Sequence, residues 1–204
     1  MQMNEWSINS LKAFESDIAE SFNRGEIKFP VHLSDGNEEA LIKIFKDVKV
    51  TDWVFCSWRS HYQCLLKGVK PEELTSAIKN GRSIALSFLK HKIFSTAIVG
   101  GQLPIAVGMA LAIKEAGNGE HVWCFVGDMT SESGIAQSSI TFATNFNLPI
   151  TFIIEDNGKS VLTDTRKTWN SELLRYEINS NPKVISFKYE SKYPHAGAGV
   201  RVQF

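Results

Sequence analysis

Two predicted strands end close to side chains that could bind a metal ion. The apolar run 121–126 is typical of a buried strand, and Gly127-Asp128 follows it directly. The run 150–154 predicts a second strand, and Asn157 lies just beyond its end. In an open parallel sheet, ligands bind outside the carboxyl ends of the strands. An aspartate and an amide oxygen placed there, with phosphate oxygens beside them, form a ligand set that suits Mg²⁺.

The segment between these strands predicts a helix over about 132–146, so that strand, helix and strand form one crossover. The free N–H groups at the start of this helix favour an anion at the same edge of the sheet. Both side chains also have simpler roles, Asp128 as a helix cap and Asn157 with Gly158 as a turn. For either residue alone the simpler role is favoured, but the pair on successive strand ends favours a metal and phosphate site.

The rest of the chain predicts alternating helices and strands. Apolar spacing and Pro71 at a helix start predict four further helices, over 11–23 (with Asn9-Ser10 as the N-cap), 38–48, 71–79 and 104–116. The last of these is apolar nearly all round, so we expect it to be buried. A further strand is predicted over 184–189. This order predicts a three-layer α/β/α fold with a mainly parallel sheet. We expect one domain over 1–204, with an N-terminal helical segment over about 1–50.

The composition excludes several classes of protein. The chain has 204 residues, 43% of them hydrophobic, which allows a sizeable core. Lys and Arg number 22, as do Asp and Glu, so no overall basic charge favours nucleic acid. No apolar run reaches the roughly 18 residues of a membrane span, and the N-terminus carries no basic and apolar signal segment. Cys56, Cys64 and Cys124 lack metal-ligand spacing and are expected to be reduced thiols in the cytoplasm, with Cys124 in the core.

The residues at the strand ends resemble a known family. Gly127-Asp128 followed by Asn157 is similar to the thiamine-diphosphate motif, in which Gly-Asp-Gly precedes an Asn. The stretch GDMTSESGIAQSSITFATNFNLPITFIIEDN aligns without a gap with the α subunit of the E1 component of 2-oxoacid dehydrogenases. Three upstream stretches resemble the same family in the same order: HLSDGNEEA from residue 32, WRSH from residue 58 and AIVGGQLPIAVGMALA from residue 97. The resemblance spans about residues 11–199 and implies the family's diphosphate-binding fold.

The resemblance implies a metal and cofactor site. Asp128, Asn157 and the backbone carbonyl of Lys159 would hold Mg²⁺, and the metal would bridge the two phosphates of thiamine diphosphate. Arg59 would pair with the diphosphate, because a guanidinium matches phosphate oxygens. The remaining cofactor-binding positions implied are Trp58, which stands where the family has Tyr, Gly127, Met129, Thr130, and the main chain of Ala97 and Val99 at the aminopyrimidine.

Two histidines are implied as catalytic. His32 would lie near the thiazolium and transfer protons, since imidazole titrates in a suitable range. Without the resemblance, a loop histidine bonded to the backbone is the favoured interpretation of His32. His195 matches one histidine of a loop that covers the site and binds carrier-domain partners in the family. Gly197 stands where a second histidine of that loop is expected, and the segment between Asn157 and this loop is shorter than in the family, so partnership with a lipoyl acyltransferase stays open.

Two residues of the motif itself differ from the family. Met129 stands in place of the third residue of Gly-Asp-Gly, where glycine lets the backbone approach the diphosphate. Binding then requires that Met129 has a negative φ and points away. Asp156 replaces the first residue of an Asn-Asn pair, and this additional carboxylate either supports the metal or repels the phosphate.

The resemblance implies an α-type subunit of a thiamine-diphosphate enzyme that decarboxylates a 2-oxo acid and transfers the activated aldehyde. The family's activating Glu lies on a β-type, pyrimidine-binding subunit. The chain is therefore expected to be inactive alone and to form an α2β2 hetero-oligomer through apolar surfaces that include 104–116. Three alternatives stay open: a transketolase-like half-subunit acting on sugars, a non-catalytic relative that binds the cofactor or a partner, and a plain flavodoxin-like binding domain.

Overall fold

Six strands form one sheet in the computed structural model, which describes residues 6–196 and 202–204. Their order across the sheet is β2-β3-β1-β4-β5-β8. In that order the strands span Ser87–Phe88, Ile93–Ser95, Trp53–Cys56, Val122–Gly127, Ile150–Asp156 and Val184–Lys188. All neighbours pair in parallel except β2 and β3. A separate antiparallel hairpin joins β6 (Lys159–Ser160) to β7 (Thr163–Asp164).

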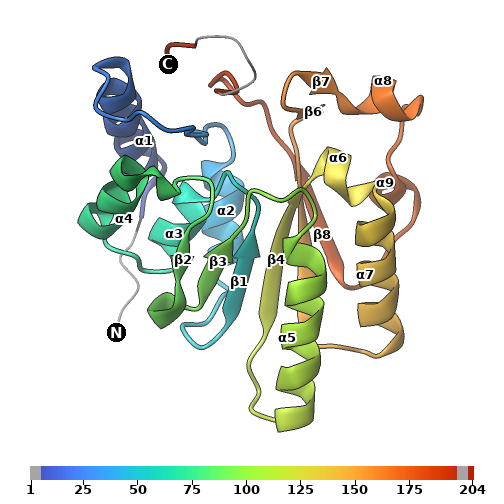
Figure 1. The fold of residues 1–204 in the computed structure, drawn as a ribbon. Coiled ribbons are helices and arrows are strands. Elements are labelled where there is room, and N and C mark those ends of the chain that lie inside the picture. The colour runs from blue at the N-terminus through green and yellow to red at the C-terminus, as the bar shows by residue number, and fades with distance from the viewer. Residues whose placement is uncertain (1–5, 197–201) are drawn as a thin grey trace.

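Helices cover both faces of this sheet, as Figure 1 shows. On one face lie α5 (Gln102–Ala116) and α7 (Gly134–Asn145). On the other lie α1 (Ile8–Asn23), α2 (Glu38–Phe45), α3 (His61–Leu66) and α4 (Pro71–Ala77). Strand β4 packs Trp123 and Phe125 toward the second group, and Cys124 and Val126 toward the first. A parallel strand buried on both faces is apolar throughout, which is why run 121–126 could be recognised. The three-layer α/β/α prediction is confirmed.

Several predicted boundaries differ from the structure. Helix α1 begins at Ile8, and its N-cap is Ser7 rather than Asn9-Ser10, because Ser7 and Ser10 bond each other's backbone N–H groups. The α-helical part of predicted helix 71–79 ends at Ala77 and continues as a wider turn over Ile78–Arg82. The helix predicted over about 132–146 is α7, Gly134–Asn145, and a single helical turn that was not predicted, α6 (Asp128–Ser131), precedes it. The short strands β1, β2 and β3 were not predicted.

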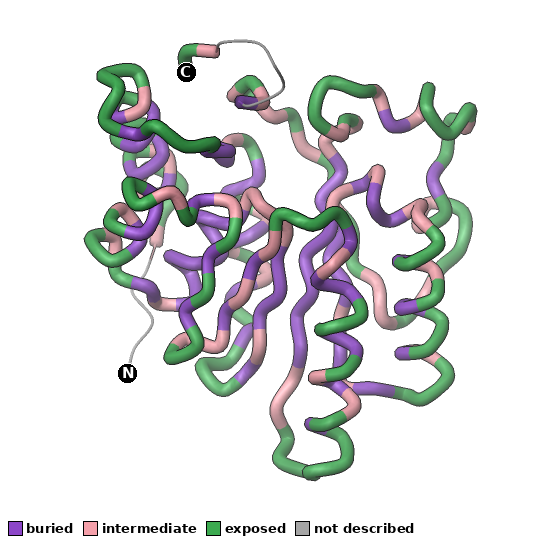
Figure 2. The backbone as a smooth tube through the Cα atoms, in the orientation of Figure 1, coloured by how far each residue is buried: buried purple, intermediate pink, exposed green. Residues whose placement is uncertain are grey.

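Helix α5 is not buried all round, contrary to the sequence prediction. Its buried residues include Leu103, Ala106 and Ala110, which pack on the sheet. The opposite side is open to solvent, and Ile105 there is 50% exposed. Figure 2 shows buried and exposed residues alternating along this helix. An apolar helix thus has one side that the described part of the chain leaves uncovered.

Three short helices complete the part of the fold that borders the strand ends. They are α6, α8 (Thr165–Trp169) and α9 (Arg175–Ile178). Cys124 lies in the core as expected, and all three cysteines are buried thiols. Across the described ranges, no helix combines the length and apolar character needed to cross a bilayer.

Candidate functional site

A cavity of about 530 Å³ lies at the carboxyl ends of β1, β4 and β5. Its walls come from four segments: 57–59 after β1, 127–130 after β4, residues of 155–162 at and after the end of β5, and 189–195 after β8. From β1 the sheet extends to β3 on one side and to β4 on the other. A cavity at such a switch in strand order is where open α/β sheets bind their ligands.

The cavity brings most of the predicted site residues together. Its lining includes Trp58, Arg59, Gly127, Asp128, Met129, Thr130, Asn157, Lys159 and His195. His32 lies directly behind this lining, with its ring stacked on His195 at 4.1 Å between centroids. Ala97 and Val99 do not line the cavity; they are exposed on the loop between β3 and α5. Gly197 lies outside the residues that the structure describes.

Asp128 is a buried carboxylate with an open coordination position. It is the first residue of α6 and only 1% exposed, because the chain passes from β4 into the helix without a loop. Its Oδ2 atom has no hydrogen-bond partner among the described residues. Burial raises the pKa of Asp128 to about 6, and the nearby Asp156 carboxylate acts in the same direction. A buried anion without a donor is costly, so this oxygen fits a site for a cation.

Asn157 and Lys159 lie in a tight turn at the end of β5. The Asn157 Oδ1 atom accepts a hydrogen bond from the Lys159 N–H at 3.2 Å. An amide oxygen has two lone pairs, so one stays available for a cation. Over the described chain, no group of three or more His, Cys, Asp or Glu side chains is arranged to hold a metal ion. A metal here would therefore take its other ligands from the amide, a backbone carbonyl and the bound ligand, which is the mixed oxygen set that Mg²⁺ accepts.

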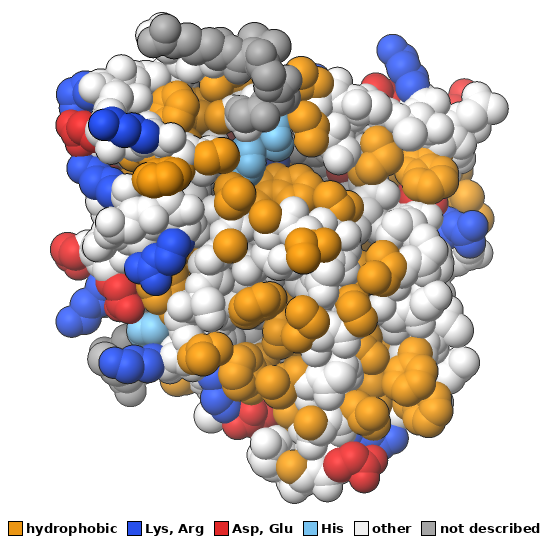
Figure 3. All heavy atoms as spheres, viewed as in Figure 1, with side chains coloured by type: hydrophobic (Ala, Val, Ile, Leu, Met, Phe, Trp, Pro, Cys, Tyr) orange, Lys and Arg blue, Asp and Glu red, His pale blue; other side chains and the backbone are white. Residues whose placement is uncertain are grey.

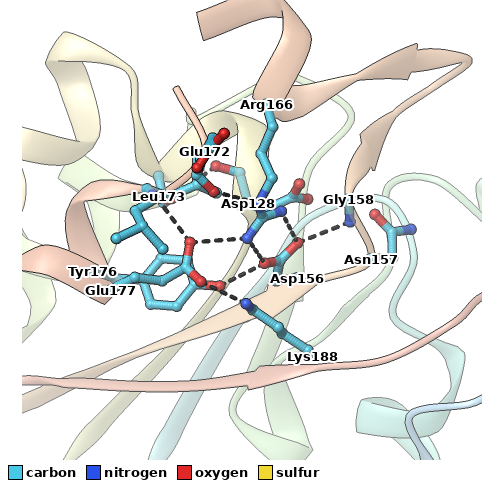
Figure 4. A network of polar contacts seen from close by, with 12 residues as sticks. Asp128, Asp156, Asn157, Gly158, Arg166, Glu172, Leu173, Tyr176, Glu177 and Lys188 are labelled. Carbon is cyan, nitrogen blue, oxygen red and sulfur yellow. Dashed lines mark hydrogen bonds and ion pairs between the residues drawn. The ribbon is translucent and has the colours of Figure 1, made fainter. Parts of the chain in front are cut away.

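The Asp156 carboxylate, adjacent in sequence, is fully engaged by protein groups (Figure 4). Arg166 donates from Nη1 to Oδ1 at 3.3 Å and from Nη2 to Oδ2 at 2.8 Å. The Gly158 N–H donates to Oδ1 at 2.8 Å, and the Tyr176 hydroxyl donates to Oδ2. Burial alone would raise the pKa of Asp156, but the hydrogen bonds from Arg166 and Tyr176 outweigh it and hold the pKa below its ordinary value. Asp156 is thus a charged carboxylate bonded within the protein.

Two stacked histidines and a tryptophan lie together at the wall formed by residues 189–195 after β8, called the tail loop below. The His32 and His195 rings are 21° from parallel, and Trp58 meets both edge-on at 6.2 and 6.5 Å between centroids. Burial, then His195 and Arg59, lower the pKa of His32 to about 3. Burial and Arg59 also lower the pKa of His195. Both rings are therefore neutral at pH 7, and the pKa that motivated His32 as a proton-transfer group is shifted out of that range.

Arg59 supplies positive charge to the cavity. Its Nε atom is buried without a hydrogen-bond partner in the described part of the chain. The His32 Nδ1 atom is buried and equally without a partner there, so among the described residues this nitrogen does not make the backbone hydrogen bond of the simpler interpretation. A guanidinium with an open donor is suited to an oxyanion such as phosphate.

Glu155 is a cavity residue to which the sequence assigned no role. Its carboxylate accepts hydrogen bonds from Asn37 Nδ2 at 3.1 Å and from Gln63 Nε2 at 3.2 Å. Burial raises its pKa to about 7, against the opposing effects of Asn37 and Arg59. The only sequence signal for Glu155 as a site residue was its position at the end of β5. Its hydrogen-bond partners come from distant segments, Asn37 before α2 and Gln63 in α3.

Two backbone features bear on ligand approach. Met129 lies within α6 and is not among the residues with positive φ, so the first of the two conditions for binding is met. Met129 is also among the residues that line the cavity. Gly36 has φ +90° and packs so closely on the tail loop that an added Cβ would lie 2.1 Å from the carbonyl oxygen of Glu190. Only glycine at position 36 leaves room for residue 190 of the cavity wall to pack this closely.

The expected helix N-terminus does not face the site as predicted. Ser133 caps α7, with its hydroxyl accepting from the Ala136 N–H at 3.4 Å. Ser133 is extended and Gly134 starts a new helix, so α7 is separate from α6, the turn that contains Asp128. The first turn at the cavity is therefore α6 and not the longer helix.

Known proteins are similar to this chain over most of its length. A family model described as dehydrogenase E1 component matches residues 7–176. The α subunit of acetoin:2,6-dichlorophenolindophenol oxidoreductase from Cupriavidus necator is 32% identical over 161 residues, 74% of this chain and 48% of that protein. The α subunit of the pyruvate dehydrogenase E1 component from Rickettsia typhi is 28% identical over 176 residues, 81% and 54% respectively. The chain thus spans about half the length of the curated relatives it matches. It belongs to the dehydrogenase E1 component family and resembles its α subunits.

Proposed function

We propose that the chain is the diphosphate-binding, α-type subunit of an enzyme that uses thiamine diphosphate and Mg²⁺ to decarboxylate a 2-oxo acid and transfer the activated aldehyde. One observation carries the proposal: a buried aspartate with an open carboxylate oxygen lines the same cavity as an arginine with an open donor. A cation for Asp128 and an anion for Arg59 together describe a metal diphosphate. The names of the relatives, an acetoin oxidoreductase and a pyruvate dehydrogenase, support the same class.

The metal would be held by Asp128, by the Asn157 amide oxygen and by the Lys159 carbonyl. Arg59 would bind the diphosphate oxygens, and the Trp58 indole N–H offers the hydrogen bond that a Tyr hydroxyl gives in the family. Gly127 and Thr130 border the same space. When bound, thiamine diphosphate supplies a nucleophilic carbon and an electron sink for the decarboxylation. The protein residues bind and orient this group and exclude water.

His32 and His195 would act on the substrate. Because both are neutral at pH 7, each can donate one hydrogen bond from its ring, and neither adds a positive charge. Stacking on His195 and the edge of Trp58 fix the His32 plane, so its free Nδ1 atom has a set direction. We assign them the orientation of the substrate carbonyl and the passage of protons to and from it.

A β-type partner would complete the site and supply the activating Glu, in an α2β2 assembly. The loop with Ala97 and Val99 is exposed beside the apolar outer side of α5 and α7, as expected if these backbone groups meet the aminopyrimidine at a subunit boundary. Figure 3 shows hydrophobic side chains spread over this face, with most charged side chains at its margins. Large exposed residues here are Ile98, Val99, Ile105, Ile135, Phe142 and Phe146. The three buried thiols fit the expected cytoplasmic location.

A non-catalytic relative is the second candidate, because Met129 lines the cavity where the family has glycine. On this candidate the Met129 side chain would restrict the approach of a diphosphate, which predicts weak or no binding. A transketolase-like half-subunit would bind the cofactor equally and differ only in its substrate.

Calorimetry tests the proposal on the chain copurified with the product of a neighbouring β-type gene. We expect thiamine diphosphate to bind only with Mg²⁺, and Asp128→Ala to abolish this binding. Glu73→Gln, on an exposed residue of α4 that is not part of the cavity lining, is the matched control and should bind normally. Absence of binding in the wild-type complex, or unchanged binding in Asp128→Ala, would overturn the metal assignment. Turnover of 2-oxo acids with a redox dye then separates decarboxylation from ketol transfer between sugars.

A further inference from the structure

The segment after β5 carries two of the three proposed metal ligands. It runs through β6, β7 and α8 to α9, and its residues Ser160, Val161 and Leu162 line the cavity. β6 and β7 pair only with each other and not with the main sheet. The position of this segment therefore depends on the side-chain contacts that fasten it to the sheet.

Those contacts converge on Arg166 of α8. Its Nη2 atom donates to Asp156 Oδ2 at 2.8 Å and to Glu177 Oε2 at 2.9 Å. Its Nε atom donates to the Glu172 carbonyl at 3.1 Å. Glu177 also accepts the Leu174 N–H at 2.8 Å and pairs with Lys188 of β8. Figure 4 shows these groups gathered around Asp156, so one guanidinium connects α8 to the end of β5 and, through Glu177 of α9, to β8.

The Asp156 carboxylate has no capacity left for a metal ion. A carboxylate offers about four acceptor positions, two on each oxygen. Gly158 and Arg166 occupy Oδ1, while Arg166 and Tyr176 occupy Oδ2. The Asp128 Oδ2 atom, in contrast, has no hydrogen-bond partner among the described residues.

We propose that Asp156 and Arg166 are a matched pair of positioning residues for the metal and diphosphate site, an inference that rests on the proposed function. Asp156 precedes Asn157 in the chain, and its bond to the Gly158 N–H closes the turn that presents Asn157 and the Lys159 carbonyl. Arg166 donates to both oxygens of the Asp156 carboxylate, which holds the turn in place, and its positive charge neutralises that carboxylate. The sequence left open whether Asp156 supports the metal or repels the phosphate. On this proposal Asp156 supports the metal site indirectly, through its hydrogen bonds to protein groups.

The pair is matched because neither side chain serves without the other. An asparagine at 156 has a single acceptor oxygen, and its NH2 group would face the donors of Arg166 or Tyr176. An uncharged residue at 166 would leave the Asp156 charge facing a diphosphate without compensation, in a mostly buried place. Removing either member therefore loosens the same turn, and removing both should cost little more than removing one.

The test uses Asp156→Asn, Arg166→Gln and the double variant in the full chain, copurified with any partner. Lys167→Gln is the matched control, since the neighbouring Lys167 is exposed and contributes only its backbone N–H and C=O groups to described hydrogen bonds. The first readout is amide hydrogen exchange over 157–168 without added ligand. We expect exchange about tenfold faster in both single variants, no further increase in the double variant, and no change in the control. Unchanged exchange in Arg166→Gln would overturn the proposal.

The second readout is the affinity for thiamine diphosphate with Mg²⁺, measured by calorimetry. Loss of a residue that orients metal ligands typically weakens binding by about 10-fold to 100-fold, and we expect this range for both single variants. Weakened binding in Asp156→Asn with normal exchange would make Asp156 a direct ligand and contradict the proposal. If the wild type itself fails to bind, the proposed function fails, whereas the exchange readout still decides whether the pair positions the turn.

Discussion

The charge on Glu155 should be visible in how the stability of the protein depends on pH. Its side chain is 8% exposed, with the amide groups of Asn37 and Gln63 as hydrogen-bond donors. Both amide oxygens, Asn37 Oδ1 and Gln63 Oε1, are buried without a partner in the described structure. A protonated Glu155 can donate to one of them, whereas the carboxylate cannot. The surroundings thus favour the neutral acid, and Glu155→Gln imitates it permanently.

The magnitude follows from the pKa. Burial raises the pKa of Glu155 from its ordinary 4.5 to about 7. Each tenfold change in proton affinity is worth about 1.4 kcal/mol, so folding the carboxylate form costs about 3 kcal/mol relative to folding the acid. Because the pKa of Glu155 is higher in the folded than in the unfolded state, the stability that the neutral acid contributes is fully present below pH 4.5. It is lost as the pH rises through about 7. Glu155→Gln should escape this loss, so its advantage over the wild type should grow with pH.

Urea unfolding followed by tryptophan fluorescence at pH 5, 6, 7 and 8 measures this difference. We expect the free energy of unfolding of Glu155→Gln, minus that of the wild type, to increase by about 2–3 kcal/mol between pH 5 and pH 8. The exposed Glu190→Gln is the control, and its difference from the wild type should not vary with pH. A difference for Glu155→Gln that stays constant or decreases over this range would refute the assignment of a buried Glu155 with a raised pKa.

Three other predictions concern Asp128, His32 and Ile105. Asp128→Asn removes a buried carboxylate whose pKa is raised from 3.8 to about 6. The free energy of unfolding in urea at pH 8 should therefore increase by about 3 kcal/mol, whereas Mg²⁺-dependent binding in calorimetry should be lost. The pKa of His32 is lowered to about 3, so the stability contributed by its neutral ring is present above pH 6.5 and lost as the pH falls toward 3. The unfolding curve of His32→Gln against decreasing pH should therefore be shallower than that of the wild type. An identical curve would contradict the buried neutral ring. Ile105→Asp should abolish copurification with a β-type chain while changing stability by less than about 0.5 kcal/mol, whereas the same change at exposed Val50 should leave copurification intact.

The sequence predicted the centre of the sheet well because β4 and β5 are buried on both faces. Their side chains are mostly apolar, with Thr151 and the terminal Glu155-Asp156 of β5 as the polar exceptions, so each strand could be recognised from its composition. The strand β1 was missed because its four residues, Trp53–Cys56, are too few to separate a buried strand from the start of a helix. The strands β2 and β3 are shorter still, with two and three residues, and exist through pairing with a neighbour rather than through local preference.

The candidate site was predicted in part for the same reason. Asp128 and Asn157 follow recognisable strands, so their proximity could be inferred. The environment of Glu155 could not be inferred, because Asn37 and Gln63 lie 118 and 92 residues away in the sequence. The stacking of His32 on His195 likewise joins residues near opposite ends of the chain. Such contacts are set by tertiary packing, and no local pattern encodes them.

The balance of charge at the strand ends explains why an added carboxylate is compatible with a diphosphate site. Asp128 and Asp156 end or follow neighbouring strands, and their surroundings push their pKa values apart, upward by burial for Asp128 and downward through Arg166 and Tyr176 for Asp156. Arg166 cancels the charge of Asp156, so the pair adds no net charge beside the cavity. In the proposed site, a divalent cation on Asp128 would then leave one positive charge for the diphosphate, and Arg59 would add another. Without Arg166 the second carboxylate would cancel what the metal contributes, so the cofactor proposal depends on Arg166 as much as on Asp128.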